Sequence, residues 1–331
     1  MSKRIILVFL ALTLIFAVGC KDDKNPTKPA TVDEFALVAT LGDAYFSNFV
    51  STTGQALNLT AQQLFENLQD GNTANDPVII DYRSAADFAT GRIRGAINIT
   101  LANLVSKIED GTIPKGKTIL NVCYTGQNSS FATAFLNLMG YDAQSLMFGM
   151  CGVTTDPSIN GTANWTNQIA ADEFATQLVT TESTPTQTHA FPNPNTGKKT
   201  AEEIMKARFG AITGSWTIGA ADVFANPANY FIINYWPKAE YLNPGHITGS
   251  FCFEPKVSLT QAAMLKYLPT DKTIVIYCYT GQTSAQLAAY LGMLGYNVKS
   301  LMYGMNGFAY GKMTKSKYVA PVTDYSAIIV K

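Results

Sequence analysis

Residues 118–153 read TILNVCYTGQNSSFATAFLNLMGYDAQSLMFGMCGV, and residues 273–308 read TIVIYCYTGQTSAQLAAYLGMLGYNVKSLMYGMNGF. The two segments align without gaps at a constant offset of 155 and share 18 identities in 36 positions, which indicates an internal duplication. In each copy an apolar strand leads through Cys-Tyr-Thr-Gly-Gln into a segment with the apolar period of a helix. A strand joined to a helix by a glycine-bearing turn is the βα unit of a parallel sheet. The repeat therefore predicts an α/β fold built from two similar domains.

The sequence before each copy repeats as well. Residues 77–83 (PVIIDYR) correspond to residues 230–236 (YFIINYW), and each is an apolar strand that ends in a polar turn. Residues 91–96 (GRIRGA) correspond to residues 245–250 (GHITGS). Residues 60–63 (TAQQ) have the pattern of a capping box, which predicts the start of a helix. Strands and helices thus alternate in both copies.

Composition limits the class of protein. The chain has 331 residues, 47% of them hydrophobic and 15% charged, which is enough apolar material for two packed cores. Its 24 basic and 24 acidic residues cancel, so the chain lacks the excess of positive charge that binds nucleic acid. Only two histidines and no Cys-x-x-Cys pair occur, which argues against a zinc or redox-metal site. We expect no cofactor and no metal.

The repeat also divides the chain into domains. We expect a first domain at residues 35–179, a linker at residues 180–200 and a second domain at residues 201–331. The linker is rich in threonine, asparagine and proline and shows no apolar period. Four apolar residues at helical spacing predict a helix that closes the first domain, namely Trp165, Ile169, Phe174 and Leu178.

The N-terminus has the pattern of an export signal. Lys3 and Arg4 precede an apolar run from Ile5 to Val18, which is too short to span a bilayer comfortably. We therefore expect a signal peptide at residues 1–19. The stretch AVGC that ends at Cys20 resembles the bacterial lipobox, which implies lipidation of Cys20 and a lipoprotein held to a membrane. A plain secretory signal with an incidental cysteine is the alternative.

The residues after Cys20 bear on the location of the protein. Residues 20–34 are polar and contain proline, which predicts a tether between the lipid and the folded part. In the best-known sorting scheme an aspartate directly after the lipidated cysteine retains a lipoprotein at the inner membrane, and here Lys21 stands at that position. We expect an extracytoplasmic, lipid-anchored protein at the outer membrane, on its periplasmic side or at the cell surface.

Cys123 and Cys278 stand where a buried strand turns into a helix. Backbone N–H groups converge at such a point and bind anions. The same field favours a thiolate over a thiol, so we expect a lowered cysteine pKa and a nucleophilic sulfur. Gly126 and Gly281 allow the turn to close without a side chain. An inert, buried cysteine is the alternative at each position.

These motifs together resemble the rhodanese family of sulfurtransferases. The residues that carry the resemblance are Asp81-Tyr82-Arg83, the Gly-x-Ile-x-Gly-Ala element at residues 91–96, the Cys-x-x-Gly loops and Gly149-Met150, and the similarity covers residues 57–153 and 215–310. The resemblance implies two rhodanese-like domains, each with a central parallel β-sheet flanked by helices. It also implies a cysteine persulfide that carries sulfane sulfur, or the heavier selenium, from thiosulfate or a mercapto acid such as 3-mercaptopyruvate to a thiol acceptor.

The resemblance further implies roles for particular residues. Cys278 and Cys123 would be catalytic, and Asp81 and Arg83 would support the end of the sheet. The anion-binding loops would comprise Tyr124, Thr125, Gly126, Gln127, Asn128 and Ser129 in the first copy and Tyr279, Thr280, Gly281, Gln282, Thr283 and Ser284 in the second.

Both loops depart from the family pattern. Many single-domain members carry arginine where this chain has Asn128 and Thr283. Without a basic residue in either loop, we expect weak binding of a dianion, and the sulfur donor stays open. The second copy also has Asn234 and Trp236 at the places of Asp81 and Arg83. We expect Cys278 to be the main site, because its loop is closer to that of the tandem sulfurtransferases, and Cys123 to be a second one.

Three further residues allow more than one interpretation. Cys151 lies near the first loop and is either a resolving thiol for Cys123 or a packing residue; the second copy has Asn306 there. For Cys252 we favour a core position and for His246 a structural role.

Two other functions remain open. One is a non-catalytic module that binds an oxyanion or a partner protein within an envelope complex. The other is a thiol redox protein that uses Cys123 and Cys151.

Overall fold

The computed structural model describes residues 32–160, 165–169 and 172–331. The expected signal peptide, the lipidation site Cys20 and the tether up to residue 31 lie outside the described residues. Within the described ranges, no helix has both the length and the apolar character needed to cross a bilayer. Residues 33–331 form one compact unit.

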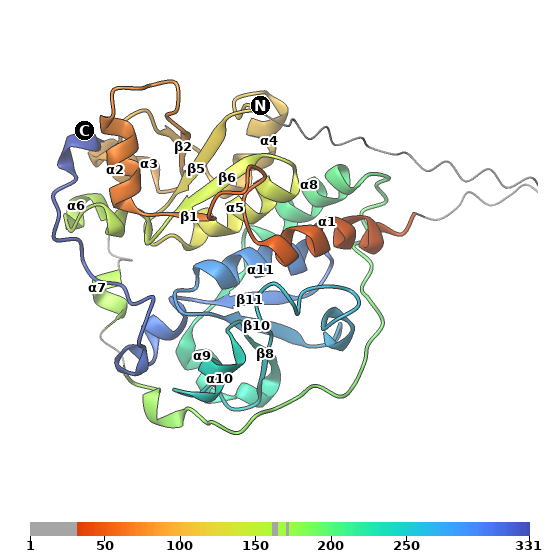
Figure 1. The fold of residues 1–331 in the computed structure, drawn as a ribbon. Coiled ribbons are helices and arrows are strands. Elements are labelled where there is room, and N and C mark those ends of the chain that lie inside the picture. Colours follow the sequence, from red (N-terminus) through yellow and green to blue (C-terminus); the bar gives the residue numbers. More distant parts are fainter. Residues whose placement is uncertain (1–31, 161–164, 170–171) are drawn as a thin grey trace, which may run out of the picture. The chain divides into compact units, whose positions relative to one another are not determined.

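Two parallel five-stranded sheets form the framework (Figure 1). The first has the order β1-β6-β5-β2-β4 and the second the order β7-β11-β10-β8-β9, so corresponding strands occupy the same places. The strands of the first sheet are β1 (Asn58–Leu59), β2 (Val78–Asp81), β4 (Ile97–Asn98), β5 (Thr118–Val122) and β6 (Asp142–Leu146). Those of the second are β7 (Thr217–Ile218), β8 (Tyr230–Asn234), β9 (Ser250–Cys252), β10 (Thr273–Tyr277) and β11 (Val298–Leu301). The structure confirms the predicted α/β fold of two similar domains.

Helices flank both sheets. The first copy contains α2 (Ala61–Gln69), α3 (Ala85–Thr90), α4 (Leu104–Glu109) and α5 (Gln127–Leu138), followed by α6 (Pro157–Asn160) and α7 (Trp165–Gln168). The second copy contains α9 (Ala220–Ala225), α10 (Lys238–Leu242) and α11 (Gln282–Met293), and each copy is preceded by a longer helix, α1 (Glu34–Asn48) or α8 (Ala201–Ile212). The capping box at Thr60 begins α2 as predicted, because Thr60 and Gln63 exchange side chain-to-backbone hydrogen bonds.

The central strands align their carboxyl ends. In the first sheet Asp81 lies beside Val122, and in the second Asn234 lies beside Tyr277. β5 and β10 are buried at every position after the first, as expected for parallel strands covered on both faces. Each cysteine loop therefore begins at the same edge of its sheet as the turn that follows β2 or β8.

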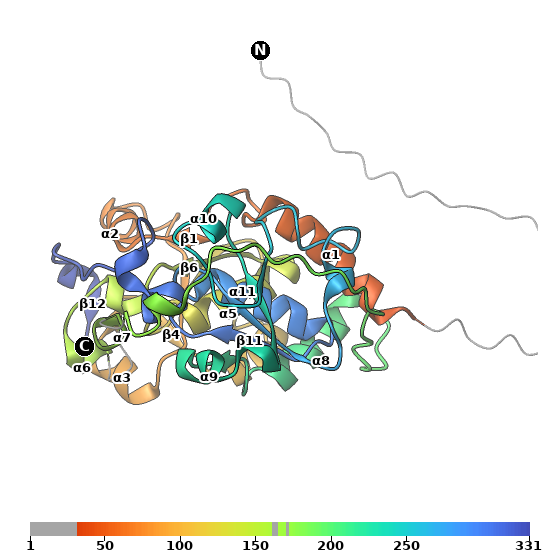
Figure 2. The same cartoon turned by 90° about the horizontal axis from the view of Figure 1, so that it is seen from below.

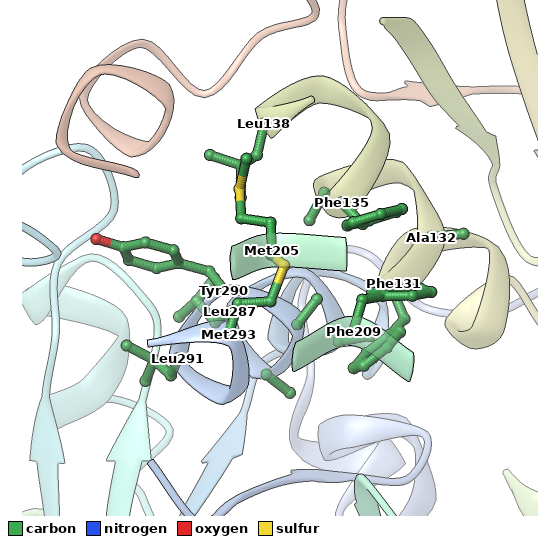
Figure 3. Close-up of a cluster of buried hydrophobic side chains, with 14 of the residues drawn as sticks. Phe131, Ala132, Phe135, Leu138, Met205, Phe209, Leu287, Tyr290, Leu291 and Met293 are labelled. Carbon is green, nitrogen blue, oxygen red and sulfur yellow. The ribbon is translucent and has the colours of Figure 1, made fainter. Parts of the chain in front are cut away.

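One hydrophobic core joins the two copies. α5 packs against α11, and α8 packs against both helices (Figure 3). Phe135 of α5 stacks on Phe209 of α8 with ring centroids 4.0 Å apart, and Tyr290 of α11 lies against Phe46 of α1 at 4.9 Å. The helices α1, α5, α8 and α11 thus form a shared layer, so neither copy has a wholly separate core.

The prediction of one helix that closes the first domain is wrong. α7 is a single turn, and Phe174 and Leu178 flank a separate 3₁₀ turn at Ala175–Gln177. Phe174 stacks on Phe224 of α9 at 4.3 Å, Leu178 packs on the core of the second copy, and Val179 pairs with His246. The apolar spacing reflects contacts with that domain rather than one helical face. Residues 180–200, all of which are described, contain no helix or strand.

The C-terminal residues return to the first copy. β12 (Ile329–Val330) pairs antiparallel with β3 (Arg92–Ile93), and Tyr325 and Ile328 belong to the core on the outer face of the first sheet. Figure 2 shows β12 and the C-terminus on the same side as α2, α3 and α6. The last residues of the chain therefore complete the domain that the sequence begins with.

Replacing Ile328 by alanine should destabilise the protein by about 2–4 kcal/mol, because the side chain is fully buried and a cavity would remain. Urea unfolding followed by circular dichroism measures this change. Val322→Ala is the control, since Val322 is 99% exposed and its loss should change the unfolding free energy by less than about 0.5 kcal/mol. Equal effects of the two substitutions would contradict the packing of the C-terminus on the first copy.

Candidate active site

Both cysteine loops pass through a left-handed glycine into a helix. Gly126 has φ 86° and directly precedes α5, and Gly281 has φ 75° and directly precedes α11. An added Cβ at Gly126 would lie 2.6 Å from Gln282 Oε1, and one at Gly281 would lie 2.8 Å from Gln127 Oε1. Glycine is required at both places by the positive φ, and a Cβ would also displace the glutamine of the other copy.

The sulfur of Cys123 lies within a set of convergent donors. It accepts hydrogen bonds from Gly126 N at 3.1 Å and Ser129 N at 3.4 Å, and it lies 3.4 Å from Ser129 Oγ. The thiol side chain is only 2% exposed. Amides at a helix N-terminus stabilise negative charge, so this arrangement suits a thiolate or a terminal persulfide sulfur.

Cys278 has a similar but sparser environment. Its sulfur accepts from Ser284 N at 3.4 Å and lies 3.6 Å from Ser284 Oγ, and the side chain is also 2% exposed. The amide of Gly281 does not make the bond that Gly126 makes, within the hydrogen bonds that the structure describes. The first copy therefore offers one more amide to its sulfur than the second.

A second serine supports each loop. Ser129 Oγ lies 2.8 Å from Ser145 Oγ, and Ser284 Oγ lies 2.8 Å from Ser300 Oγ. Sequence reasoning missed Ser145 and Ser300 as site residues. The sequence did contain a signal for them, because the two serines occupy the same position in the repeated Ser-Leu-Met motif. All four hydroxyls are buried, so each pair fixes the hydroxyl that faces the cysteine.

The other residues of the two loops differ in burial and in the contacts that they make. Tyr124 Oη bonds to the Asp87 carboxylate and accepts from Ser84 N at 3.1 Å, so the first-copy tyrosine is tied to α3. Thr125 and Thr280 are buried, and Asn128 and Thr283 are half-buried at the first turns of α5 and α11.

The two glutamines of the loops reach into the opposite copy. Gln127 Oε1 accepts from Tyr303 N at 2.6 Å, and Gln282 Oε1 accepts from Phe148 N at 3.3 Å. Their side-chain oxygens are thus engaged away from their own cysteines. The sequence repeat identified both residues without showing which way they point.

Asp81 and Arg83 form a buried brace. Arg83 Nη2 lies 2.7 Å from Asp81 Oδ2, and the remaining guanidinium donors bond to the carbonyl oxygens of Ile159 and Gly91, both at 2.7 Å. This arrangement secures the strand end against α6 and the turn before β3. The charge of Arg83 is fully engaged, as expected for a buried arginine.

The second copy replaces this brace by an aromatic stack. Trp236 is fully buried and lies parallel to Tyr279, with ring centroids 4.7 Å apart and an interplanar angle of 13°. A cation also approaches that tyrosine: Lys315 Nζ lies 5.3 Å from the ring centroid and pairs with Glu240. The side chain of Lys315 is half-exposed. Sequence reasoning missed Lys315, which lies outside the repeat.

Comparison with known proteins identifies the family. The family model for the rhodanese-like domain matches residues 60–153 and 222–310. The chain belongs to the rhodanese family. Both matched segments contain one of the cysteine loops, so this rhodanese is a tandem of two domains.

Solved structures match this chain over different lengths. A rhodanese-like domain protein from Staphylococcus aureus is 25% identical, over 28% of this chain and 86% of that one, with a TM-score of 0.24. A thiosulfate sulfurtransferase from Pseudomonas aeruginosa is 16% identical, over 86% of this chain and 49% of that one, with a TM-score of 0.26. No protein of curated function matches this rhodanese.

Cys151 occupies an enclosed position beside the first loop. Its backbone N–H donates to Tyr124 O at 3.1 Å, and its side chain packs with Trp165 and Tyr318. Burial raises the pKa of Cys151 to about 11. At the same place in the second domain, Asn306 Nδ2 bonds to Tyr279 O at 2.7 Å. Cys151 in the first domain and Asn306 in the second therefore each hold the cysteine loop of their own domain by a hydrogen bond to its tyrosine carbonyl.

The remaining candidate residues have structural environments. The predicted core position of Cys252 is wrong, because the residue is only half-buried on the edge strand β9. Its sulfur lies 3.6 Å from Trp236 O, and burial raises its pKa to about 11. His246 is buried, stacks on Tyr241 at 3.5 Å, and faces the carbonyl oxygen of Thr181. The four described cysteines are free thiols, and in the described part of the chain no three potential ligands cluster as for a metal ion.

The raised pKa of Cys151 predicts slow alkylation in the folded protein. At pH 8 a thiol of pKa about 11 is roughly one part in a thousand ionised, against about one in ten for an ordinary cysteine. Iodoacetamide labelling read out by peptide mass spectrometry should give a rate at least about 100-fold below that of the unfolded chain, rising with pH up to about 11. Native labelling as fast as in the unfolded chain would contradict this environment.

Proposed function

We propose that this rhodanese is a sulfurtransferase that carries sulfane sulfur as a cysteine persulfide, mainly at Cys278 and secondarily at Cys123. The observation that carries the proposal is the pair of equivalent contacts between sulfur and helix N-terminus, from Ser284 N and Ser129 N, both at 3.4 Å. Such amides stabilise the anionic sulfur before transfer and the persulfide after it.

The reaction consists of two displacements at sulfur. With thiosulfate, the thiolate attacks the sulfane sulfur, the bond between the two sulfur atoms of the donor breaks, and sulfite leaves with the bonding electrons. With a mercapto acid, the carbon–sulfur bond breaks, and the carbon fragment leaves with the electron pair and takes up a proton. An acceptor thiolate then attacks the outer persulfide sulfur and releases the enzyme thiolate. Selenium follows the same balance when the donor is selenosulfate, because the thiolate attacks its selenium and sulfite again leaves with the bonding electrons.

Lys315 supports an anionic donor at the second domain. Its half-exposed ammonium lies over Tyr279, the residue after Cys278, and could exchange its contact with Glu240 for one with an incoming anion. Arg83 lies 6.0 Å from the ring of Tyr124 in the first domain but is fully buried and bonded. This difference in available charge supports Cys278 as the main site.

We further propose that the protein works outside the cytoplasm on a lipid anchor at Cys20. The support is the lipobox-like stretch at the N-terminus, with Lys21 favouring the outer membrane. The acceptor would then be a thiol of the envelope, as a small molecule or as part of a protein complex.

A binding module is the second candidate function. Both loop cysteines are only 2% exposed, so an acceptor thiol reaches either sulfur only when its loop opens. Loops that stay closed would favour a module that binds an oxyanion or a partner without covalent transfer. The redox alternative has less support, because the raised pKa makes Cys151 a poor resolving thiol at neutral pH.

Intact-protein mass spectrometry tests the transfer chemistry. Incubation of the mature chain with thiosulfate, 3-mercaptopyruvate or selenosulfate should add one chalcogen atom that a thiol removes. Cys278→Ser should abolish most of this gain, and Cys123→Ser should abolish less. Equal loss in both variants would overturn the ranking of the sites, and no gain with any donor while both thiols are reduced and accessible would favour the binding module.

Replacing Lys315 by methionine should raise the KM for thiosulfate about 5–10-fold at low ionic strength with little change in kcat, because the ammonium contributes to binding the dianion. Lys315→Arg should keep most of the affinity. Lys317→Met is the matched control, since Lys317 lies over Tyr310, 4.6 Å from the ring centroid. An unchanged KM in Lys315→Met would exclude this role.

A further inference from the structure

The glutamines of the two cysteine loops connect the two domains reciprocally. Gln127 begins α5 directly after the first loop, yet its Oε1 accepts from Tyr303 N, at 2.6 Å, in the turn after β11. Gln282 begins α11, and its Oε1 accepts from Phe148 N, at 3.3 Å, in the turn after β6. Each loop therefore bonds to a turn that belongs to the opposite domain.

The turn that receives each bond has a restricted backbone. Phe148 has φ 61° and Tyr303 has φ 62°, a left-handed conformation that is uncommon for aromatic residues. Such a residue keeps this conformation only when its surroundings hold it. The hydrogen bond that the backbone N–H of each residue donates to the opposite glutamine is one of the contacts that do so.

The same turn holds the cysteine loop of its own domain. In the second domain Met305 N donates to Cys278 O at 2.9 Å, and Asn306 N donates to Tyr279 O at 3.0 Å. An added Cβ at Gly304 would lie 2.3 Å from Cys278 O, so turn and loop are in direct contact. A shift of the turn is therefore transmitted to the loop.

The first domain repeats this arrangement. Met150 N donates to Cys123 O at 2.8 Å, and Cys151 N donates to Tyr124 O at 3.1 Å. An added Cβ at Gly149 would lie 2.3 Å from Cys123 O. The chain of contacts from glutamine through turn to cysteine loop is thus the same in both directions.

We propose that each loop glutamine is a positioning residue for the cysteine of the opposite domain. Gln127 holds the turn that supports Cys278, and Gln282 holds the turn that supports Cys123. The shorter bond, 2.6 against 3.3 Å, makes Cys278 more dependent on the first domain than Cys123 is on the second. The first cysteine loop then helps to position Cys278 through Gln127, whether or not Cys123 itself carries sulfur.

Site-resolved alkylation of the full chain tests the proposal. Cys278 is 2% exposed, so iodoacetamide reaches it only when the loop opens, and a lost hydrogen bond makes opening easier. Gln127→Ala should raise the alkylation rate of Cys278 roughly fivefold to tenfold, the range expected for one hydrogen bond, and change that of Cys123 less than twofold. Gln127→Glu keeps an acceptor oxygen and should restore a rate within about twofold of the wild type.

Two further variants serve as counterparts. Gln282→Ala should reverse the pattern, raising the rate of Cys123 about twofold to threefold and leaving that of Cys278 nearly unchanged. Gln144→Ala is the matched control, because Gln144 is also buried but bonds to Ala56 O at 2.6 Å within the first domain. It should change the rates of both cysteines equally or not at all.

An effect of Gln127→Ala confined to Cys123, or an equal effect on both cysteines, would overturn the proposal. If neither cysteine reacts in any variant, amide hydrogen exchange decides: Gln127→Ala should speed exchange in residues 303–306 and 278–281, and unchanged exchange there would overturn it as well. None of these measurements uses a sulfur donor, so their failure is distinguishable from failure of the proposed transfer activity.

Discussion

The packing of α5 on α11 is the contact on which both cysteine loops depend. The two helices are buried along almost their whole length, and each begins directly after a loop glycine. Their N-terminal ends meet so closely that a Cβ on either Gly126 or Gly281 would collide with the opposite glutamine. Because a close-packed interior does not deform continuously, the position of one loop constrains the position of the other. The duplicated sequence thus forms a pair of sites with a common support rather than two independent domains.

Segments outside the repeats strengthen this dependence. Tyr325 and Ile328 pack on the first domain although they follow the second in sequence, and Phe174 packs on the second domain although it precedes the extended segment between the two. Each domain therefore buries apolar side chains from a segment on the far side of the other domain or of the connecting segment. Separating the copies would expose this surface to water, which explains why they fold as one compact unit.

The two sites differ in how they use charge. In the first, Asp81 and Arg83 neutralise each other in the interior, and the sulfur has the larger set of amide donors. In the second, the uncharged Trp236 occupies the place of the arginine, and the half-exposed Lys315 lies over the ring of Tyr279. A buried guanidinium bonded on all sides cannot turn to an anion without leaving a carboxylate unpaired. A lysine at the surface can move at little cost, and this difference is the physical basis for proposing Cys278 as the main site.

The sequence by itself determined the two parallel sheets, the place of each cysteine at a strand end and the glycine that follows it. These features depend on local apolar period and turn chemistry, which neighbouring residues carry. Only the tertiary structure decided which residues from distant parts of the chain contact each site. Local pattern could not assign the role of Lys315, the crossed side chains of Gln127 and Gln282, or the packing of Phe174. Their roles arise from contacts between residues distant in sequence, and no periodicity records which of two apolar surfaces a side chain will cover.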